Sequence, residues 1–150
     1  MLFQTADTLG LTGLTKSQLR EWTGRGRRGL LAPDVEPAGP GRHALFAWQT
    51  LLVLRLMRVL HEDFAAEVGA WAPAAQELRR QLDGLSFPSL WRASVLFSSR
   101  VSATLIEKAS DIDEAGVVIP LEPHLSVLAT KLSLPLPDQL PLFLPMVVSR

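Results

Sequence analysis

Five cationic side chains and one tryptophan fall within residues 12–34, in the stretch TGLTKSQLREWTGRGRRGLLAPD. Lys and Arg neutralise phosphates and release counterions, while short polar side chains can form hydrogen bonds with base edges. The chain therefore offers both kinds of contact in one short segment. The cationic residues are Lys16, Arg20, Arg25, Arg27 and Arg28, and the polar residues between the first two are Ser17 and Gln18.

The balanced composition of the chain hides an uneven distribution of charge. Fifteen Lys and Arg are matched by fifteen Asp and Glu over 150 residues. The first 58 residues carry eight Lys or Arg and four Asp or Glu, a net charge of +4, so the rest of the chain carries −4. Asymmetry of this kind indicates that one half meets a polyanion while the other half has another role.

Other kinds of chemistry find little support in the sequence. The chain has no cysteine, which excludes thiolate catalysis, disulfides and thiolate metal sites. The three histidines lack the spacing of metal ligands, so we expect no metal and no cofactor. The acidic residues between 111 and 114 are best interpreted as a solvated turn between strands, and no nucleophile has an evident base. We therefore expect that the protein is not an enzyme.

We also expect a soluble, cytoplasmic protein that does not enter a membrane. The first ten residues, MLFQTADTLG, lack the cationic start and the sustained apolar run of a signal peptide. The most hydrophobic later stretch, residues 51–60, contains Arg55 and Arg58 and is too short to span a bilayer.

The N-terminal elements predict a pair of short helices followed by a hairpin. Thr5 is the expected N-cap of a helix over residues 5–10, with Gly10 as its stop, and Gly13 can take the positive φ of a tight turn. Thr15 then caps a second helix. Beyond it, arms at residues 30–33 and 42–46 flank the tip PAGPG, which predicts a β-hairpin or wing.

The remaining periodicities predict an α+β fold. Apolar stripes indicate helices over residues 48–61 and 64–82, the second kinked or broken at Pro73. Short β-branched runs at 94–99, 102–107 and 116–121 predict strands, and residues 122–132 a helix. The proline-rich tail, 132–150, favours extended geometry. The Asp-Gly pair at 83–84 suggests two domains, 1–83 and 84–150, the second a small α+β unit for an effector or for dimerisation.

The order of these elements resembles the MerR family of transcription regulators. The resemblance spans about residues 3–82 and rests on LTGLTKSQLREW, GLLAPD, GRHALF and LLVLRLMRVL, which occur in the family's order and spacing. It implies an N-terminal winged helix-turn-helix and a homodimer that binds a near-palindromic site on double-stranded DNA. It also implies contact with RNA polymerase at a promoter and no enzymatic activity.

The resemblance also implies which residues meet DNA. Thr15, Lys16, Ser17 and Arg20 match the start of the family's recognition helix, and Trp22 stands where the family has a large aromatic. Ala44 falls where the family has a phosphate-binding Arg, so Arg42 and His43 are the candidates to replace it. The full set of expected DNA-binding residues is Thr15, Lys16, Ser17, Gln18, Arg20, Trp22, Arg25, Arg27, Arg28, Arg42 and His43.

Three alternatives stay open at this point. The Arg-rich insertion TGRGRR, which the family lacks, could bind phosphate backbone or could be a solvated loop. The winged helix could serve as a protein-interaction adaptor. Trp71 and Trp91 could line a pocket for a lipophilic cation, together with Phe87, Phe97 and either Glu107 or Glu122.

Overall fold

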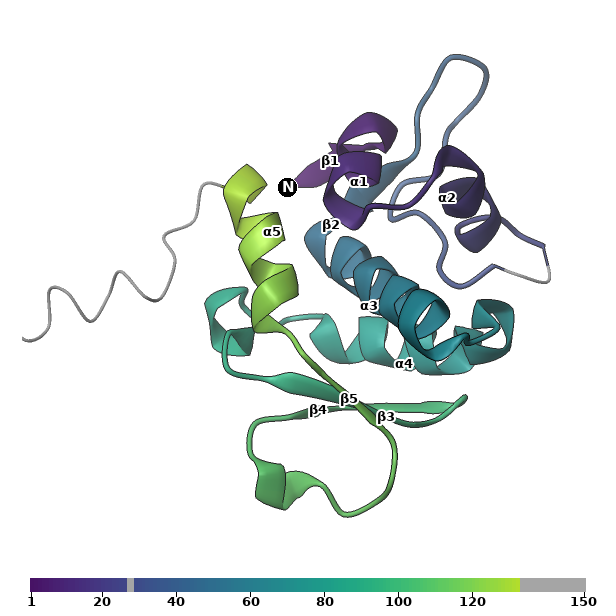
Figure 1. Cartoon of the computed structure of the whole chain (residues 1–150). Coiled ribbons are helices and arrows are strands. Elements are labelled where there is room, and N and C mark those ends of the chain that lie inside the picture. The colour runs from purple at the N-terminus through teal and green to yellow at the C-terminus, as the bar shows by residue number, and fades with distance from the viewer. Residues whose placement is uncertain (27–28, 133–150) are drawn as a thin grey trace, which may run out of the picture.

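The computed structural model describes residues 1–26 and 29–132, which form an α+β structure with two small antiparallel sheets (Figure 1). The helix α3 (Trp48–Phe64) lies at the centre and packs against α1 (Thr5–Thr12), α4 (Ala72–Leu82) and α5 (Glu122–Leu132). On its other side α4 contacts the three-stranded sheet. The predicted class α+β is therefore confirmed, while residues 27, 28 and 133–150, which include Arg27, Arg28 and the predicted extended tail, lie outside the described residues.

The first helix begins and ends differently from the prediction. Gln4 occupies the N-cap position of α1 and makes no side-chain cap, so Thr5 is not the N-cap. Gly10 does not end the helix: α1 continues to Thr12, and Gly13, with φ +73°, provides the left-handed cap. The hydroxyl of Thr12 donates to the carbonyl of Thr8 at 2.7 Å, which keeps a buried polar group satisfied inside the helix.

The second helix, α2 (Lys16–Trp22), begins where the sequence predicts it. A tight turn at Gly13 joins α1 to α2, as its positive φ predicted. Leu19 and Trp22 are the buried residues of α2, which matches their predicted position on one face.

The wing differs from the predicted hairpin. Strand β2 (Leu45–Ala47) pairs with β1 (Leu2–Gln4) and not with residues 30–33, and Phe3 lies opposite Phe46. The first arm is not a strand: the N–H groups of Leu30 and Leu31 donate to the carbonyl of Trp22, and both side chains are buried in the core. An isolated bridge between Val35 and Leu45, with reciprocal hydrogen bonds of 3.1 and 3.0 Å, closes the loop over residues 36–44. This loop is called the wing below.

The helix expected over residues 64–82 is broken into two pieces, one of the two outcomes predicted from Pro73. Helix α3 runs beyond residue 61 to Phe64 and ends at Ala65, and a 3-10 turn η1 (Val68–Trp71) precedes α4. Pro73 lies in the first turn of α4, where its missing N–H leaves no hydrogen bond unmade. The chain therefore breaks before the proline and restarts with it.

The second sheet contains all three predicted strands in the order β4-β3-β5: β3 (Ser94–Ser99), β4 (Ser102–Ile106) and β5 (Val117–Pro120). In this antiparallel sheet Val95 lies opposite Leu105 on one side and Ile119 on the other. The 3-10 turn η2 (Pro88–Leu90) precedes the sheet, η3 (Ala109–Asp111) lies between β4 and β5, and the predicted helix α5 follows.

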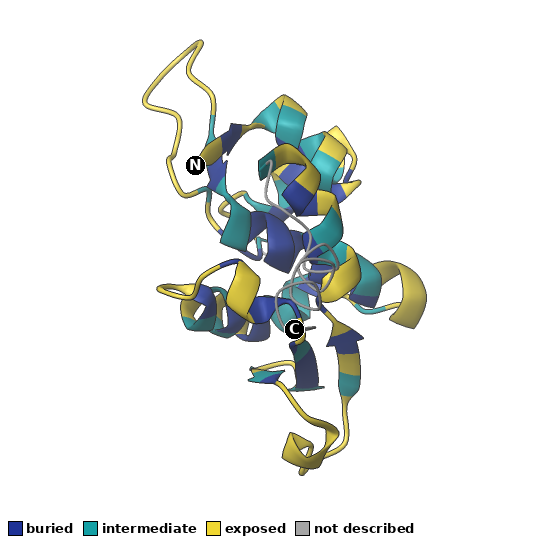
Figure 2. Ribbon diagram, turned by 90° about the vertical axis from the view of Figure 1, so that its left-hand side faces the viewer, coloured by how far each residue is buried: buried dark blue, intermediate teal, exposed yellow. Residues whose placement is uncertain are grey.

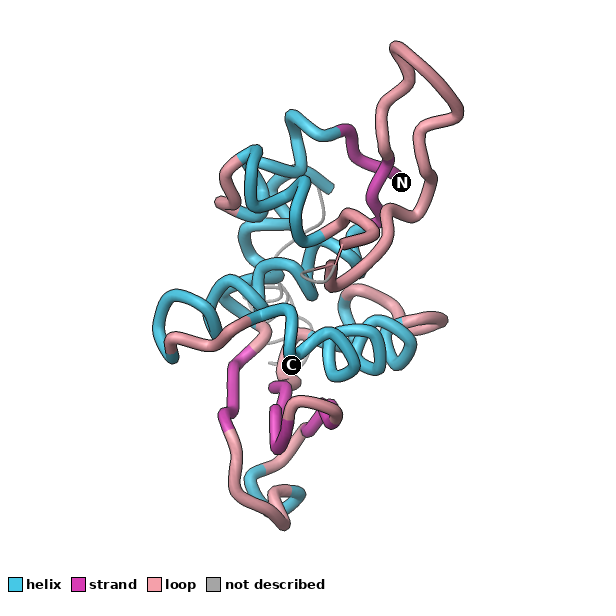
Figure 3. Tube along the Cα trace, turned by 90° about the vertical axis from the view of Figure 1, so that its right-hand side faces the viewer, coloured by secondary structure: helices cyan, strands magenta, loops and turns pink. Residues whose placement is uncertain are grey.

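Buried residues on both sides of position 84 belong to one hydrophobic cluster, which extends from Phe3 to Ala129 (Figure 2). The division into domains at 83 and 84 stays a prediction about how the chain folds. Two long exposed loops, the wing and residues 107–116, extend at opposite ends of the molecule (Figures 2 and 3). The acidic residues 111–114 lie in the second of these loops and are exposed, as expected for a solvated turn.

Candidate nucleic-acid interface

The start of α2 is fixed by reciprocal hydrogen bonds between Thr15 and Gln18. The backbone N–H of Gln18 donates to the hydroxyl of Thr15 at 3.1 Å, and the backbone N–H of Thr15 donates to Oε1 of Gln18 at 3.0 Å. This capping box satisfies donors that the first turn would otherwise leave unpaired. It also exposes Lys16 and Ser17 at the front of the helix, while Gln18 is half-buried and uses its carbonyl oxygen locally.

The opposite face of α2 is anchored in the core through Trp22. The indole is 3% exposed and meets the ring of His61 edge-on, with centroids 5.8 Å apart. The carbonyl of Trp22 accepts hydrogen bonds from the N–H groups of Leu30 and Leu31 at 2.6 and 3.2 Å. A side chain buried in this way holds α2 in place, and the predicted contact of Trp22 with DNA stays a prediction.

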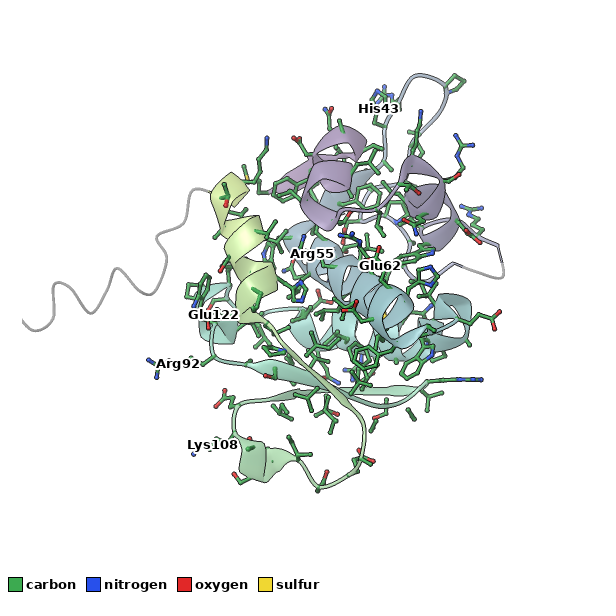
Figure 4. The ribbon with its side chains drawn as sticks, in the orientation of Figure 1. His43, Arg55, Glu62, Arg92, Lys108 and Glu122 are labelled. Atoms are coloured by element: carbon green, nitrogen blue, oxygen red, sulfur yellow. The ribbon has the colours of Figure 1, made fainter. Side chains whose placement is uncertain are left out.

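A groove of about 750 Å³ separates α2 from the wing. Lys16 and Arg20 contribute cationic side chains from α2, and Arg42 and His43 contribute polar side chains from the wing. All four residues are exposed, and His43 projects from the wing loop at the far end of the molecule from the larger sheet (Figure 4). The structure thus brings together cationic residues that the sequence separates by more than 20 positions. The other lining residues are Gln4, Thr5, Ala6, Leu9, Leu19, Thr23, Pro37, Ala44 and Phe46.

Sequence reasoning missed the contribution of Gln4, Thr5 and Thr23 to this groove. Gln4 and Thr5 join it because the pairing of β1 with β2 brings the start of α1 beside the wing. Thr23 follows α2 and donates its hydroxyl to the carbonyl of Leu19 at 2.6 Å. The pairing of Phe3 with Phe46 was the missing information, and two isolated apolar residues give no signal for it in the sequence.

Asp34 connects the wing to the helices behind it. Its Oδ2 accepts hydrogen bonds from the N–H of Ala47 at 2.7 Å and from the hydroxyl of Thr50 at 2.8 Å, and its Oδ1 pairs with Arg79 at 2.9 Å. Burial alone would raise the pKa of Asp34, but the bonds from Ala47, Arg79 and Thr50 outweigh it and lower the pKa. The carboxylate therefore holds the residue before α3 and the hydroxyl of Thr50 in its first turn, and its charge complements the positive pole of the helix dipole.

The Arg-rich insertion is tied to the wing by Arg25. Its guanidinium pairs with Glu36 at 2.8 Å, although the Arg25 side chain is 88% exposed. Surface pairs of this kind are weak, and a phosphate can compete for the same guanidinium. Arg27 and Arg28 belong to the same insertion, and their predicted phosphate contacts stay predictions.

The C-terminal end of α1 is held by two arginines of α3. Arg55 donates to the carbonyl of Leu11, and Arg58 donates to that of Thr12 at 3.5 Å while pairing with Glu62 at 2.9 Å. Cations at this end of a helix complement its dipole and satisfy its free carbonyls. Arg55 also donates through Nε to Nδ1 of His124 at 3.2 Å, so α5 joins the same group (Figure 4).

The two predicted ligand-binding tryptophans lie in different groups of aromatic rings. Trp71 is half-buried and meets Phe97 with ring centroids 6.2 Å apart. Trp91 is buried against Phe87 at 6.3 Å, and Phe87 also meets Trp48 at 5.2 Å. Trp71 therefore packs against the larger sheet and Trp91 against the aromatic group beside α3, and the lipophilic-cation pocket stays a prediction.

Within residues 1–26 and 29–132, no group of three or more His, Asp or Glu side chains is arranged to hold a metal ion. None of the helices in these ranges is long and apolar enough to span a bilayer. No protein-family model matches the chain, and no curated protein does.

Proposed function

We propose that the protein is a DNA-binding transcription regulator with a MerR-like winged helix-turn-helix. The observation that carries the proposal is the groove in which Lys16 and Arg20 of α2 face Arg42 and His43 of the wing. A sugar-phosphate strand in this groove is neutralised from both walls, while the front of α2 enters the major groove beside it. The capped first turn presents Lys16 and Ser17 to base edges, and Arg20 follows in the last turn of α2.

The proposal includes a homodimer on a near-palindromic site. One helix-turn-helix reads a single half-site, and a two-fold dimer places two recognition helices about 34 Å apart, one turn of the duplex. The resemblance to the MerR family, together with the observed order of helix, turn, helix, loop and helix, supports this part of the proposal. RNA polymerase and a cytoplasmic location belong to the same role.

The salt dependence of duplex binding tests the proposal directly. We expect the chain to bind a random duplex with an affinity that falls steeply with salt, and in vitro selection to enrich a near-palindrome. Arg20→Ala should weaken binding about tenfold and reduce the salt slope by about one unit. Fluorescence anisotropy at several salt concentrations measures both quantities.

Arg92→Ala is the matched control for that substitution. Arg92 is also exposed, but it lies beside the larger sheet, far from the wing (Figure 4). We expect it to change the affinity less than twofold. Equal losses in the two variants, or a folded protein that binds no duplex at low salt, would overturn the proposal.

A protein-interaction adaptor is the second candidate. Ala44, half-buried in the wall of the groove, stands where the MerR family has a phosphate-binding Arg, which favours weaker DNA contact by the wing. The adaptor function replaces the first proposal if the folded dimer does not bind duplex.

A further inference from the structure

An ion pair borders the groove between α2 and the wing. The guanidinium of Arg25 meets a carboxylate oxygen of Glu36 at 2.8 Å, and the two residues are 11 positions apart in the chain. Thr23 and Pro37, which line the groove, are close neighbours of this pair in the sequence. The contact therefore joins the segment after α2 to the wing, between which we propose that a phosphate strand lies.

The backbone on the Arg25 side of the pair is held against α2. The N–H of Leu30 donates to the carbonyl of Trp22 at 2.6 Å, so the segment that carries Arg25 begins and ends beside Trp22. A Cβ on Gly29 would lie 2.2 Å from the carbonyl oxygen of Gly24, and this close approach requires glycine. Arg25 is thus carried by a segment that is closed at its base.

The backbone on the Glu36 side is fixed as well. Glu36 directly follows Val35, which exchanges two backbone hydrogen bonds with Leu45. Asp34, two positions before Glu36, pairs with Arg79 at 2.9 Å. These contacts fix the base of the wing, from which Glu36 reaches Arg25.

The pair has the chemistry of a reversible contact. A guanidinium binds carboxylates and phosphates through the same N–H donors, so the two anions compete for it. The Arg25 side chain is 88% exposed and that of Glu36 is 49% exposed, and exposed pairs contribute little to stability. A phosphate can therefore displace the carboxylate of Glu36, but it then lies beside an uncompensated negative charge.

We propose that Glu36 competes with the phosphate backbone of DNA for Arg25. In the free protein its carboxylate occupies the guanidinium, and a duplex held by Lys16 and Arg20 displaces it before Arg25 contacts a phosphate. Glu36 thereby lowers the affinity of the groove for DNA. The DNA step rests on the proposed function, whereas competition between Glu36 and an anion for Arg25 does not.

Fluorescence anisotropy with a random duplex tests the DNA step. We expect Glu36→Gln to tighten duplex binding about fivefold and to steepen the salt dependence by up to about one unit, since no freed carboxylate then takes up a cation. Glu62→Gln is the matched control: the Glu62 side chain is also 49% exposed and pairs with Arg58 at 2.9 Å, but it lies on α3 and does not line the groove. It should change the affinity less than twofold, because salt screens distant charges.

A double-mutant cycle separates competition for Arg25 from a general repulsion of phosphates by Glu36. If Glu36 acts through Arg25, Glu36→Gln should tighten duplex binding at least threefold more in the parent than in Arg25→Ala. Equal gains in the two backgrounds, or equal effects of Glu36→Gln and Glu62→Gln, would overturn the inference even where the parent binds duplex.

A titration without DNA keeps the two proposals apart. Pyrophosphate is added to the full chain, and the Nε–Hε signal of Arg25 is followed by two-dimensional NMR. We expect Glu36→Gln to shift this signal before any anion is added, and to lower at least threefold the pyrophosphate concentration that half-saturates its response. If both changes occur and no duplex binds, the proposed function fails and the competition stands. If neither occurs, the competition fails, whatever the duplex result.

Discussion

One carboxylate, that of Asp34, determines where the wing sits relative to the helices. It accepts from the backbone of Ala47 and the hydroxyl of Thr50 and pairs with Arg79, so three separate segments meet at a side chain that is 19% exposed. Arg79 in turn donates through Nε to the hydroxyl of Thr50 at 2.9 Å. Every donor in this group finds an acceptor, and loss of the central carboxylate leaves several of them unmatched.

We expect Asp34→Ala to lower the free energy of unfolding by about 2 kcal/mol, since it leaves the N–H of Ala47, the hydroxyl of Thr50 and the guanidinium of Arg79 without this acceptor. Urea denaturation measures the loss. Asp83→Ala is the control, because Asp83 pairs with the same Arg79 but has a side chain that is 66% exposed. Its cost should stay below about 0.5 kcal/mol. Similar costs for the two variants would contradict the assigned role of Asp34.

At the scale of elements, the turn between α1 and α2 depends on one glycine. Gly13 has φ +73°, and a Cβ there would collide with the guanidinium of Arg58, which reaches the end of α1. Gly10 lies inside α1 with open space around its Cα. Position 13 therefore requires glycine, whereas position 10 has room for a side chain on a helical backbone.

Substitution of each glycine by alanine should have opposite effects on stability. Gly13→Ala is expected to cost about 1–2 kcal/mol, from the left-handed backbone and the displaced Arg58. Gly10→Ala should stabilise the protein by about 0.5–1 kcal/mol, because alanine is the better helix former and meets no neighbour. Thermal unfolding of the two variants beside the parent compares them. A loss of stability in Gly10→Ala would contradict the described end of α1.

The same elements indicate what the sequence can and cannot predict. Neighbouring residues were sufficient to predict the cap at Thr15, the break near Pro73 and the strand over residues 94–99, because each of these features is determined locally. The sequence did not allow the contacts between distant segments to be predicted. Nothing near Leu30 distinguishes a strand arm from a core segment, and its backbone is held by Trp22 and by Gln76 of α4. The ends of α1 were also predicted wrongly: Gln4, which makes no side-chain cap, holds the N-cap position expected of Thr5, and the helix continues past Gly10 to Thr12.

The candidate site follows the same rule. Lys16 and Arg20 could be expected on one helix, but their position opposite Arg42 depends on the β1–β2 pairing. A second hollow, of about 490 Å³, was missed because its lining comes from residues 18, 21, 22, 61 and 65–69, which share no motif.

At the scale of the whole molecule, α5 joins the C-terminal half to the helix pair that carries the interface. Lys131 pairs with Asp7 of α1 at 3.0 Å, and His124 accepts from Arg55, which also binds the end of α1. Burial, and then the positive charge of Arg55, lower the pKa of His124 to about 4. The imidazole is therefore neutral at pH 7, with Nδ1 free to accept the hydrogen bond from Arg55.

Acid should reduce the contribution of His124, which accepts from Arg55, to the free energy of unfolding. The pKa of His124 is about 4 in the folded chain and near its ordinary 6.5 in the unfolded chain, so the unfolded state binds the proton more readily between these values. The contribution of His124 to the free energy of unfolding is therefore fully present above pH 6.5 and is lost as the pH falls toward 4. We expect a loss of about 1–2 kcal/mol, reduced from the full shift because solvent screens a half-buried group.

Thermal unfolding between pH 7 and pH 4 measures this loss, and His124→Gln isolates its source. Glutamine does not titrate and can still accept from Arg55 through its amide oxygen, so the variant should be less sensitive to pH over this range. Asp34 does not confuse the result: its pKa is lowered on folding, so its contribution is lost only below its ordinary value of 3.8. An equal decline in the parent and in His124→Gln would mean that the link between α5 and α3 does not titrate, and that the acid sensitivity arises elsewhere in the molecule.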